Sequence, residues 1–140
     1  MDPFETMEIG STGLKVTRLG LGGAPLGGVE TPDLSDREAV DTIRRALALG
    51  MRYVDTAPFY GRGRSELRYR EALAEVPRDS YVISTKVGRL LKTDGAEDVD
   101  FEGMDLEALP ESEAVFDFTR DGVLRSFEQS LQRLRLERVD

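Results

Sequence analysis

The chain has 140 residues, of which 39% are hydrophobic and 33% are charged, a size and composition typical of one folded domain and not of a disordered chain. It contains no cysteine and no histidine, which excludes disulfides, thiolate or imidazole metal ligands and a Ser/His/Asp triad, so we expect no metal site. The net charge of −8 is concentrated in residues 92–118, which hold ten acidic residues and one basic residue, whereas the remainder is nearly neutral.

The charge and hydropathy patterns also exclude two classes of partner. No segment has the clustered Lys and Arg that nucleic-acid binding requires. No apolar run approaches the roughly 20 residues of a membrane span, and residues 1–5 lack the apolar core of a signal peptide. We therefore expect a soluble cytoplasmic protein whose partner is neither nucleic acid nor a membrane.

The first half of the chain predicts a hairpin, a strand and a helix. Apolar residues alternate on both sides of the glycine-containing turn at 10–13, which indicates a β-hairpin over residues 7–16. Residues 19–22 form a short predicted strand that enters a glycine-rich loop over residues 22–28. Ser35 and Glu38 match a capping box, and the helix that follows has an apolar stripe and ends at Gly50.

Strands and helices continue to alternate in the second half. Strands are predicted over residues 53–56 and 81–86, and a helix begins at Ser65 and stops before Pro77. Residues 92–118 lack a clear period and are interpreted as an acidic loop insertion. A third helix is predicted over residues 120–136, and residues 139–140 resemble the start of another strand. The apolar face of this third helix is expected to consist of Val123, Leu124, Phe127, Leu131 and Leu134.

This alternation predicts an α/β fold with parallel strands and right-handed crossovers. Both a doubly wound sheet and a (β/α) barrel fit the order of the elements. A complete barrel needs about 250 residues, so the chain holds fewer than four of the eight barrel units.

The glycine-rich loop does not match a dinucleotide fingerprint. Gly20 and Gly22 follow a strand, but Pro25 stands where the motif requires its third glycine, and no helix begins there. A P-loop is also excluded, because no Gly-Lys-Ser/Thr follows. The glycines therefore indicate a loop with tight turns.

Three side chains fall where predicted strands end. Asp55 lies near the end of the strand over 53–56, Tyr60 in the loop beyond it, and Lys86 at the end of the strand over 81–86. The carboxyl ends of parallel strands build the active sites of α/β folds. Neighbouring strands are about 4.8 Å apart, which places an ion pair between Asp55 and Lys86 within reach.

A tyrosine beside an ammonium group has a chemical use. The ordinary tyrosine pKa is near 10, and the charge of Lys86 would favour the phenolate and lower the pKa of Tyr60. Lowering it by about three pH units takes roughly 4 kcal/mol and would make Tyr60 a proton donor or acceptor near neutral pH. A structural salt bridge beside a packed tyrosine explains the same spacing, so the residues alone leave both interpretations open.

The chain resembles the N-terminal half of the aldo/keto reductases from about residue 7 to residue 140. The matching segments, in order, are residues 14–23 (LKVTRLGLGG), 55–61 (DTAPFYG), 84–89 (STKVGR) and 126–134 (SFEQSLQRL), followed by Val139 and Asp140. Within the family, the second and third segments are most similar to aldose 1-dehydrogenases and to pyridoxal or galactose dehydrogenases.

The resemblance implies the N-terminal half of a (β/α)₈ TIM barrel whose early hairpin caps the N-terminal mouth. It implies hydride transfer between NADP or NAD and the carbonyl or hydroxyl carbon of a sugar or small aldehyde. Tyr60 would be the catalytic proton donor or acceptor, Lys86 would lower its pKa, and Asp55 would hold Lys86. The implied binding positions are Gly22, Gly23, Ala24 and Asp55 for the cofactor and Phe59 for the substrate.

The sequence also departs from the family pattern. The catalytic histidine that follows the Val-Asp pair in the family is absent, because the sequence stops at Asp140, before the fourth strand. We therefore expect residues 1–140 to be a partial domain that is active only when the barrel is completed. A truncated, non-catalytic barrel fragment or a partner-binding module is the alternative.

An isolated half-barrel should also self-associate or bind a complementing C-terminal half. Its open strand edges would recruit other strands. Barrel-facing side chains such as Val54, Val82 and Ser84, or their sheet neighbours, would lack the opposite wall, at a cost of several kcal/mol for a few hundred Å² of apolar area.

Overall fold

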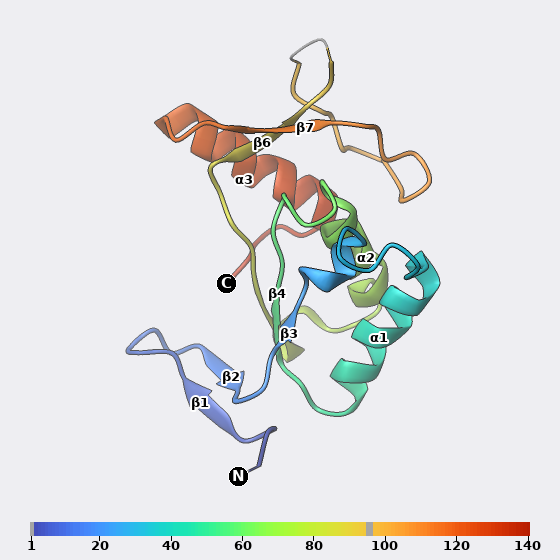
Figure 1. The fold of residues 1–140 in the computed structure, drawn as a ribbon. Helices are drawn as coiled ribbons and strands as arrows, with labels where there is room; N and C mark the ends of the chain where they lie inside the picture. Colours follow the sequence, from blue (N-terminus) through green and yellow to red (C-terminus); the bar gives the residue numbers. More distant parts are fainter. Residues whose placement is uncertain (1, 95–96) are drawn as a thin grey trace.

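The structure, a computed structural model, describes residues 2–94 and 97–140. Its short strands alternate with three α-helices and two single 3₁₀ turns (Figure 1). In chain order the elements are β1 (Thr6–Glu8), β2 (Lys15–Thr17), β3 (Leu21–Gly22), η1 (Pro25–Gly27), α1 (Asp36–Ala48), β4 (Tyr53–Asp55), α2 (Arg64–Leu73), η2 (Arg78–Ser80), β5 (Val82–Ser84), β6 (Arg89–Lys92), β7 (Glu113–Phe116) and α3 (Arg120–Leu134).

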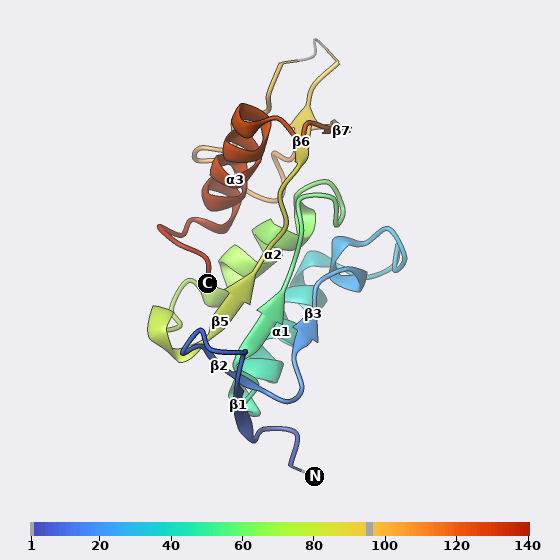
Figure 2. The same ribbon diagram turned by 90° about the vertical axis from the view of Figure 1, so that its left-hand side faces the viewer.

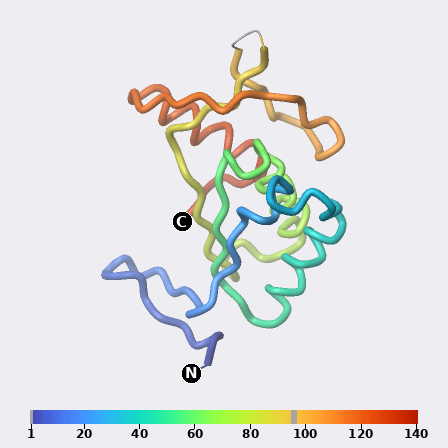
Figure 3. The backbone as a smooth tube through the Cα atoms, in the orientation of Figure 1, coloured from blue at the N-terminus to red at the C-terminus, as the bar shows by residue number. Residues whose placement is uncertain are grey.

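The strands form three separate sheets. β1 and β2 make an antiparallel hairpin, β3, β4 and β5 make a parallel sheet in that order, and β6 pairs antiparallel with β7. Figure 2 shows α1 and α2 behind the parallel sheet, so both helices cover one of its faces. In Figure 3 the β1–β2 hairpin lies at the bottom of the view, and the segment that contains β6 and β7 lies at the top. The predicted α/β fold and the early hairpin are confirmed.

The main core fills the space between the parallel sheet and the two helices that cover it. Val54 of β4 and Ile83 of β5 are fully buried there against Ile43 of α1. The expectation that Val54 would face the missing wall of a barrel is therefore wrong, because alternation along the strand points it toward the helices. The partly exposed residues of the other sheet face are Tyr53, Asp55, Val82 and Ser84.

The start and end of α1 follow the local sequence signals. The Ser35 hydroxyl accepts a hydrogen bond from the Glu38 amide at 3.2 Å, and the Glu38 carboxylate accepts one from the Ser35 amide at 3.0 Å. At the other end, Gly50 adopts a φ of 106° just after the last helical turn. The predicted capping box and glycine stop are confirmed, and they fix where the loop after β3 ends.

The acidic segment over residues 92–118 is not simply a solvated loop. It contributes β7 to the sheet with β6, and Val99 and Phe101 are buried against Leu91 of β6. Basic side chains of α2 and α3 bind it, because Arg70 donates to the Met104 carbonyl and Arg125 contacts Asp98 at 2.8 Å. Residues 95 and 96 of this predicted insertion lie outside the described residues.

The predicted apolar stripe of α3 is present, but most of it is not buried. Leu134 is buried, but Leu124 is 43% exposed and the other three predicted residues are only partly buried. The buried face of α3 is instead mainly polar and includes Ser126, Gln129 and Arg133. It consists of these residues with Gly122, Ser130 and Leu134.

The parallel sheet remains open within residues 2–94 and 97–140, and none of these residues closes it into a barrel. Its β5 edge begins to pair with the last residue, because the Asp140 amide donates to the Ile83 carbonyl at 3.0 Å. The fold therefore presents the carboxyl ends of β3, β4 and β5 at one edge. In the described part of the chain, no helix is long and apolar enough to span a membrane.

Candidate active site

A polar row crosses the carboxyl end of the parallel sheet. Gly22, Asp55 and Ser84 are register partners on β3, β4 and β5. The Ser84 hydroxyl donates to Asp55 Oδ1 at 2.6 Å, and it also lies 3.1 Å from the Tyr53 hydroxyl. These contacts orient the Asp55 carboxylate and leave its second oxygen for another partner.

That partner is Lys86. Its Nζ lies 2.8 Å from Asp55 Oδ2 and donates to the Thr56 carbonyl at 2.9 Å. Lys86 Nζ also lies 4.9 Å from the centroid of the Tyr60 ring. The structure thus brings together the three side chains that the strand-end pattern singled out.

The Lys86 ammonium is stabilised in its charged form. Partial burial lowers its pKa, but the hydrogen bond with Asp55 and the interactions with Tyr60 outweigh that effect and raise the pKa above the ordinary lysine value. Lys86 therefore carries a positive charge at neutral pH, next to the tyrosine ring.

A close contact between two loops positions Tyr60. The Cα of Gly27 packs against the backbone of Tyr60 and Gly61, where a Cβ would meet the Gly61 nitrogen at 2.5 Å. Residues 61–63 then have three successive positive φ values, and Arg62 in their middle is held by a 2.7 Å hydrogen bond to the Ser112 carbonyl. This geometry fixes the loop between β4 and α2 on both sides of the tyrosine.

A cavity of about 350 Å³ adjoins these residues. Phe59, for which the resemblance implies substrate binding, lines it together with residues that sequence reasoning did not single out, among them Arg89 and Phe116. Arg89 ends the matching segment over residues 84–89, three positions after Lys86, whereas Phe116 enters the site only through the pairing of β6 with β7. The lining residues are Ala57, Pro58, Phe59, Tyr60, Lys86, Val87, Arg89 and Phe116.

Ser84 was also missed as a site residue, although a signal was present. It lies two residues before Lys86 in an otherwise apolar strand, and strand periodicity places Ser84 and Lys86 on the same side. The hydroxyl group then faces the carboxylate of Asp55, which is its register partner on β4.

The predicted cofactor residues differ in their surroundings. Gly22 is exposed, and nothing lies within 4 Å of the position where its Cβ would be. Gly23 is buried, and a Cβ there would meet Ser65 Oγ at 2.7 Å and the Asp55 carbonyl oxygen at 2.8 Å. Packing therefore accounts for Gly23, whereas Gly22 borders open space and is the register partner of Asp55; Ala24 is half-buried.

A second tyrosine near these strand ends, Tyr69, is part of the buried core. Tyr69 of α2 is fully buried, and its hydroxyl donates to the Leu21 carbonyl at 3.1 Å. Burial, and to a smaller extent the Asp55 carboxylate, raises the pKa of Tyr69. A buried phenol that keeps its proton is unsuited to proton exchange, which argues against Tyr69 as a proton donor.

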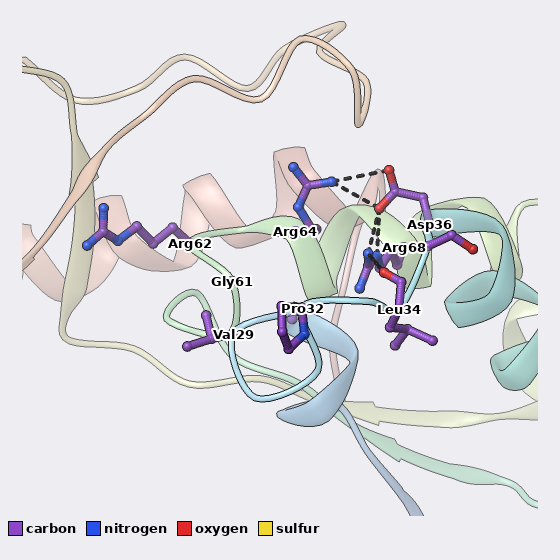
Figure 4. Close-up of a pocket in the computed structure, with 11 residues that line it drawn as sticks. Val29, Pro32, Leu34, Asp36, Gly61, Arg62, Arg64 and Arg68 are labelled. Carbon is purple, nitrogen blue, oxygen red and sulfur yellow. Dashed lines mark hydrogen bonds and ion pairs between the residues drawn. The ribbon is translucent and has the colours of Figure 1, made fainter.

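Another cavity, of about 460 Å³, lies beside the starts of α1 and α2 (Figure 4). Figure 4 shows Arg64 and Arg68 pointing toward Asp36, with contacts as short as 2.7 Å. Arg68 has a structural role here, because it is buried and also donates hydrogen bonds to the Leu26 and Leu34 carbonyls. It fixes the glycine-rich loop, and Arg62, which also lines the cavity, donates a hydrogen bond to the Ser112 carbonyl.

The strand end that carries Lys86 is supported by a buried ion pair. Arg133 of α3 and Glu66 of α2 are fully buried, and Arg133 Nε lies 2.5 Å from Glu66 Oε2. The other Glu66 oxygen accepts a 2.7 Å hydrogen bond from Thr85, the residue before Lys86. Sequence reasoning missed this support, since both residues look like ordinary charged helix positions.

Comparison with known proteins identifies the family of the chain. The model of the aldo/keto reductase family matches residues 18–140. The chain belongs to the aldo/keto reductase family. Among curated relatives, the chain is 40% identical to the pyridoxal 4-dehydrogenase of Microbacterium luteolum over 97% of its own length and 41% of that protein. It is 37% identical to the L-galactose dehydrogenase of Arabidopsis thaliana over 100% of its length and 37% of that protein.

Solved structures place the fold in the same family. The glycerol dehydrogenase of Gluconobacter oxydans superimposes with a TM-score of 0.71 and 32% identity over 98% of this chain and 38% of that chain. An aldo-keto reductase of Klebsiella pneumoniae in complex with NADPH has a TM-score of 0.60 and 21% identity over 90% of this chain and 34% of that chain. The chain spans about two fifths of the length of the curated relatives that it matches. Its predicted family and barrel-type fold are confirmed.

Proposed function

We propose that this chain is part of an NAD(P)-dependent oxidoreductase that acts on a sugar or a small aldehyde or alcohol. The observation that carries the proposal is the contact of Lys86 with both Asp55 and Tyr60, at the edge of a cavity formed by strand ends. Membership of the aldo/keto reductase family supports the oxidoreductase class, and the relatives include sugar and pyridoxal dehydrogenases.

Each of the three side chains has a distinct proposed role. Tyr60 donates a proton from Oη to the substrate oxygen in reduction and accepts it in oxidation. Lys86 stabilises the negative charge that develops on Tyr60 Oη as the proton leaves. Asp55 acts through Lys86, because its carboxylate holds the ammonium in place at 2.8 Å.

The surroundings of β3 fit a nicotinamide cofactor beside this group. Gly22 has no atom near its Cβ position, and it is the register partner of Asp55. A flat ring can approach the backbone there, and Gly22, Gly23, Ala24 and Asp55 would border it. When bound, the cofactor supplies or accepts the hydride, which is chemistry that protein side chains lack.

The proposal is tested with Tyr60→Phe in the full-length protein. Steady-state turnover of a panel of sugars and aldehydes should fall about 10²- to 10⁴-fold, because the proton donor is lost, while NAD(P)H binding measured by nicotinamide fluorescence should change little. Tyr81→Phe is the matched control, since Tyr81 lies outside the residues that line the cavity. Near wild-type turnover in Tyr60→Phe would contradict the proposed proton transfer.

A non-catalytic fragment that binds a partner is the second candidate. The open edge of the parallel sheet within the described residues supports partner binding, because an unpaired strand edge binds other strands. Gel filtration coupled to light scattering tests this candidate on the 140-residue chain. We expect self-association and weak or no NAD(P)H binding, whereas a monodisperse monomer that unfolds in one sharp transition would contradict it.

A further inference from the structure

The guanidinium group of Arg89 lies between two aromatic rings. Arg89 is the first residue of β6, and its Cζ lies 3.9 Å from the centroid of the Phe59 ring and 4.4 Å from that of the Phe116 ring. Phe59 comes from the loop after β4, whereas Phe116 is the register partner of Arg89 on β7. Phe118 stacks on Phe116 with a centroid separation of 5.4 Å and extends the aromatic surface.

Both rings lie close enough to the guanidinium for a cation–π interaction. A guanidinium group binds aromatic rings through its flat faces, and its five N–H donors lie in its plane. Across residues 2–94 and 97–140, no carboxylate forms a salt bridge with Arg89, and no acceptor forms a hydrogen bond with its side chain. Other arginines in the same half of the molecule do have such partners, such as Arg125 with Asp98 and Arg133 with Glu66.

The location of the Arg89 guanidinium points to a ligand. Arg89 lines the cavity that also contains Tyr60 and Lys86, and most of the other lining residues are apolar. The charge of Lys86 is balanced by Asp55 at 2.8 Å, so the charge of Arg89 is the unbalanced one in this cavity. An arginine held beside two rings, whose N–H groups bind no acceptor among the described residues, is suited to bidentate binding of a carboxylate or phosphate.

We propose that Arg89 binds an anionic group of the substrate, and that the preferred substrates are therefore aldehydes or sugars that carry a carboxylate or phosphate away from the reacting carbon. This inference rests on the proposed function, because it places the reacting carbon at Tyr60 in the same cavity. Phe59 and Phe116 serve as positioning residues that hold the guanidinium plane.

The test compares matched substrates in the full-length protein. Succinic semialdehyde and butanal differ by one carboxylate, and glucose 6-phosphate and glucose differ by one phosphate. In the wild type, kcat/KM should be at least about 10-fold higher for the charged member of at least one pair, as expected for a charge-assisted hydrogen bond. Arg89→Met should lower that value about 10- to 100-fold and change the neutral member less than about 3-fold.

Two further variants separate binding from general electrostatics. Arg89→Lys keeps the charge but loses the planar pair of donors, so its kcat/KM for the charged substrate should be intermediate. Arg37→Met removes one positive charge at a side chain that is 91% exposed on α1, and it should leave both substrates unchanged. The melting temperature of each variant is measured in parallel, and Met preserves the apolar stem that packs beside the rings.

Several results would overturn the inference. One is an equal loss of kcat/KM on charged and neutral substrates in a folded Arg89→Met. Another is a wild type that does not prefer the charged member of either pair. A third is a rise only in the cofactor KM, which would assign Arg89 to a cofactor phosphate. Tyr60→Phe tests the proposed function separately, because it should lower turnover of both members of a pair. If neither member is turned over, saturation-transfer NMR with succinate decides: loss of the signal in Arg89→Met supports anion binding by Arg89, and an unchanged signal overturns it.

Discussion

The helices α1 and α3 look alike in sequence but bury opposite kinds of side chain. Each has a cap residue, Ser35 or Thr119, whose side chain accepts an amide hydrogen bond from the first turn. Each also has an apolar stripe at helical spacing. α1 buries its stripe, including Ile43, whereas α3 buries a mainly polar face that includes Gln129 and Arg133.

The difference arises from what each helix packs against. α1 lies over the parallel sheet and α2, where apolar side chains such as Val54 and Ile83 are available. α3 packs against α2 and β6, which offer the Glu66 carboxylate and backbone groups of Leu91. Periodicity therefore indicates that a helix has two faces, but the neighbouring elements decide which face is buried.

The largest expected effect comes from breaking the polar contact of α3. In Arg133→Met the Glu66 carboxylate stays buried without its charged partner, so the free energy of unfolding should fall by about 3–5 kcal/mol. Urea unfolding of the full-length protein measures this loss.

The double variant Arg133→Met with Glu66→Met is the matched control. Replacing both charges by apolar side chains of similar length should restore much of the loss, because no unpaired charge remains. A double variant as unstable as Arg133→Met alone would show that the pair is not the cause of the difference between the helices.

A smaller, pH-dependent effect is expected on the α1 side. Burial raises the pKa of Asp36, but hydrogen bonds and attraction from Arg68 and Arg64 outweigh it and lower the pKa below its ordinary value. A carboxylate with a lowered folded-state pKa stabilises the fold above its ordinary pKa near 3.9, and this contribution is lost as the pH falls through the folded-state value.

Asp36→Asn tests this dependence. Because Asp36 is partly exposed and solvent screens it, we expect the variant to lose only about 1–2 kcal/mol of unfolding free energy at pH 7. The gap to the wild type should close as the pH falls through the lowered folded-state pKa of Asp36. Chemical unfolding at several pH values measures the gap, and a gap that does not change with pH would contradict the assignment to ionised Asp36.

The smallest expected changes in stability come from shortening one apolar side chain on each helix. Ile43→Val on α1 should cost about 1 kcal/mol, because a buried methylene is lost from a packed core. Leu124→Ala on α3 removes more apolar volume but should change stability by no more than about 0.5 kcal/mol, because Leu124 is 43% exposed. Thermal or urea unfolding compares the two variants, and a larger loss for Leu124→Ala would mean that the apolar face of α3 is covered in solution.

The sequence by itself determined the features that depend on neighbouring residues in the chain. The capping box at Ser35, the glycine stop at Gly50 and the β-hairpin are local, because the groups that form them lie a few residues apart. The placement of Asp55 and Lys86 was also predictable, since parallel strands bring their carboxyl ends to one edge of a sheet.

Only the tertiary structure decided the contacts between residues far apart in the sequence. Phe116 reaches Arg89 at the candidate site because β7 pairs with β6, and no local pattern encodes that pairing. The burial of Arg133 likewise depends on Glu66, which lies 67 positions earlier in the chain. A local sequence pattern reports the preferences of one segment, whereas the partner of a buried charge is supplied by whichever element packs against it.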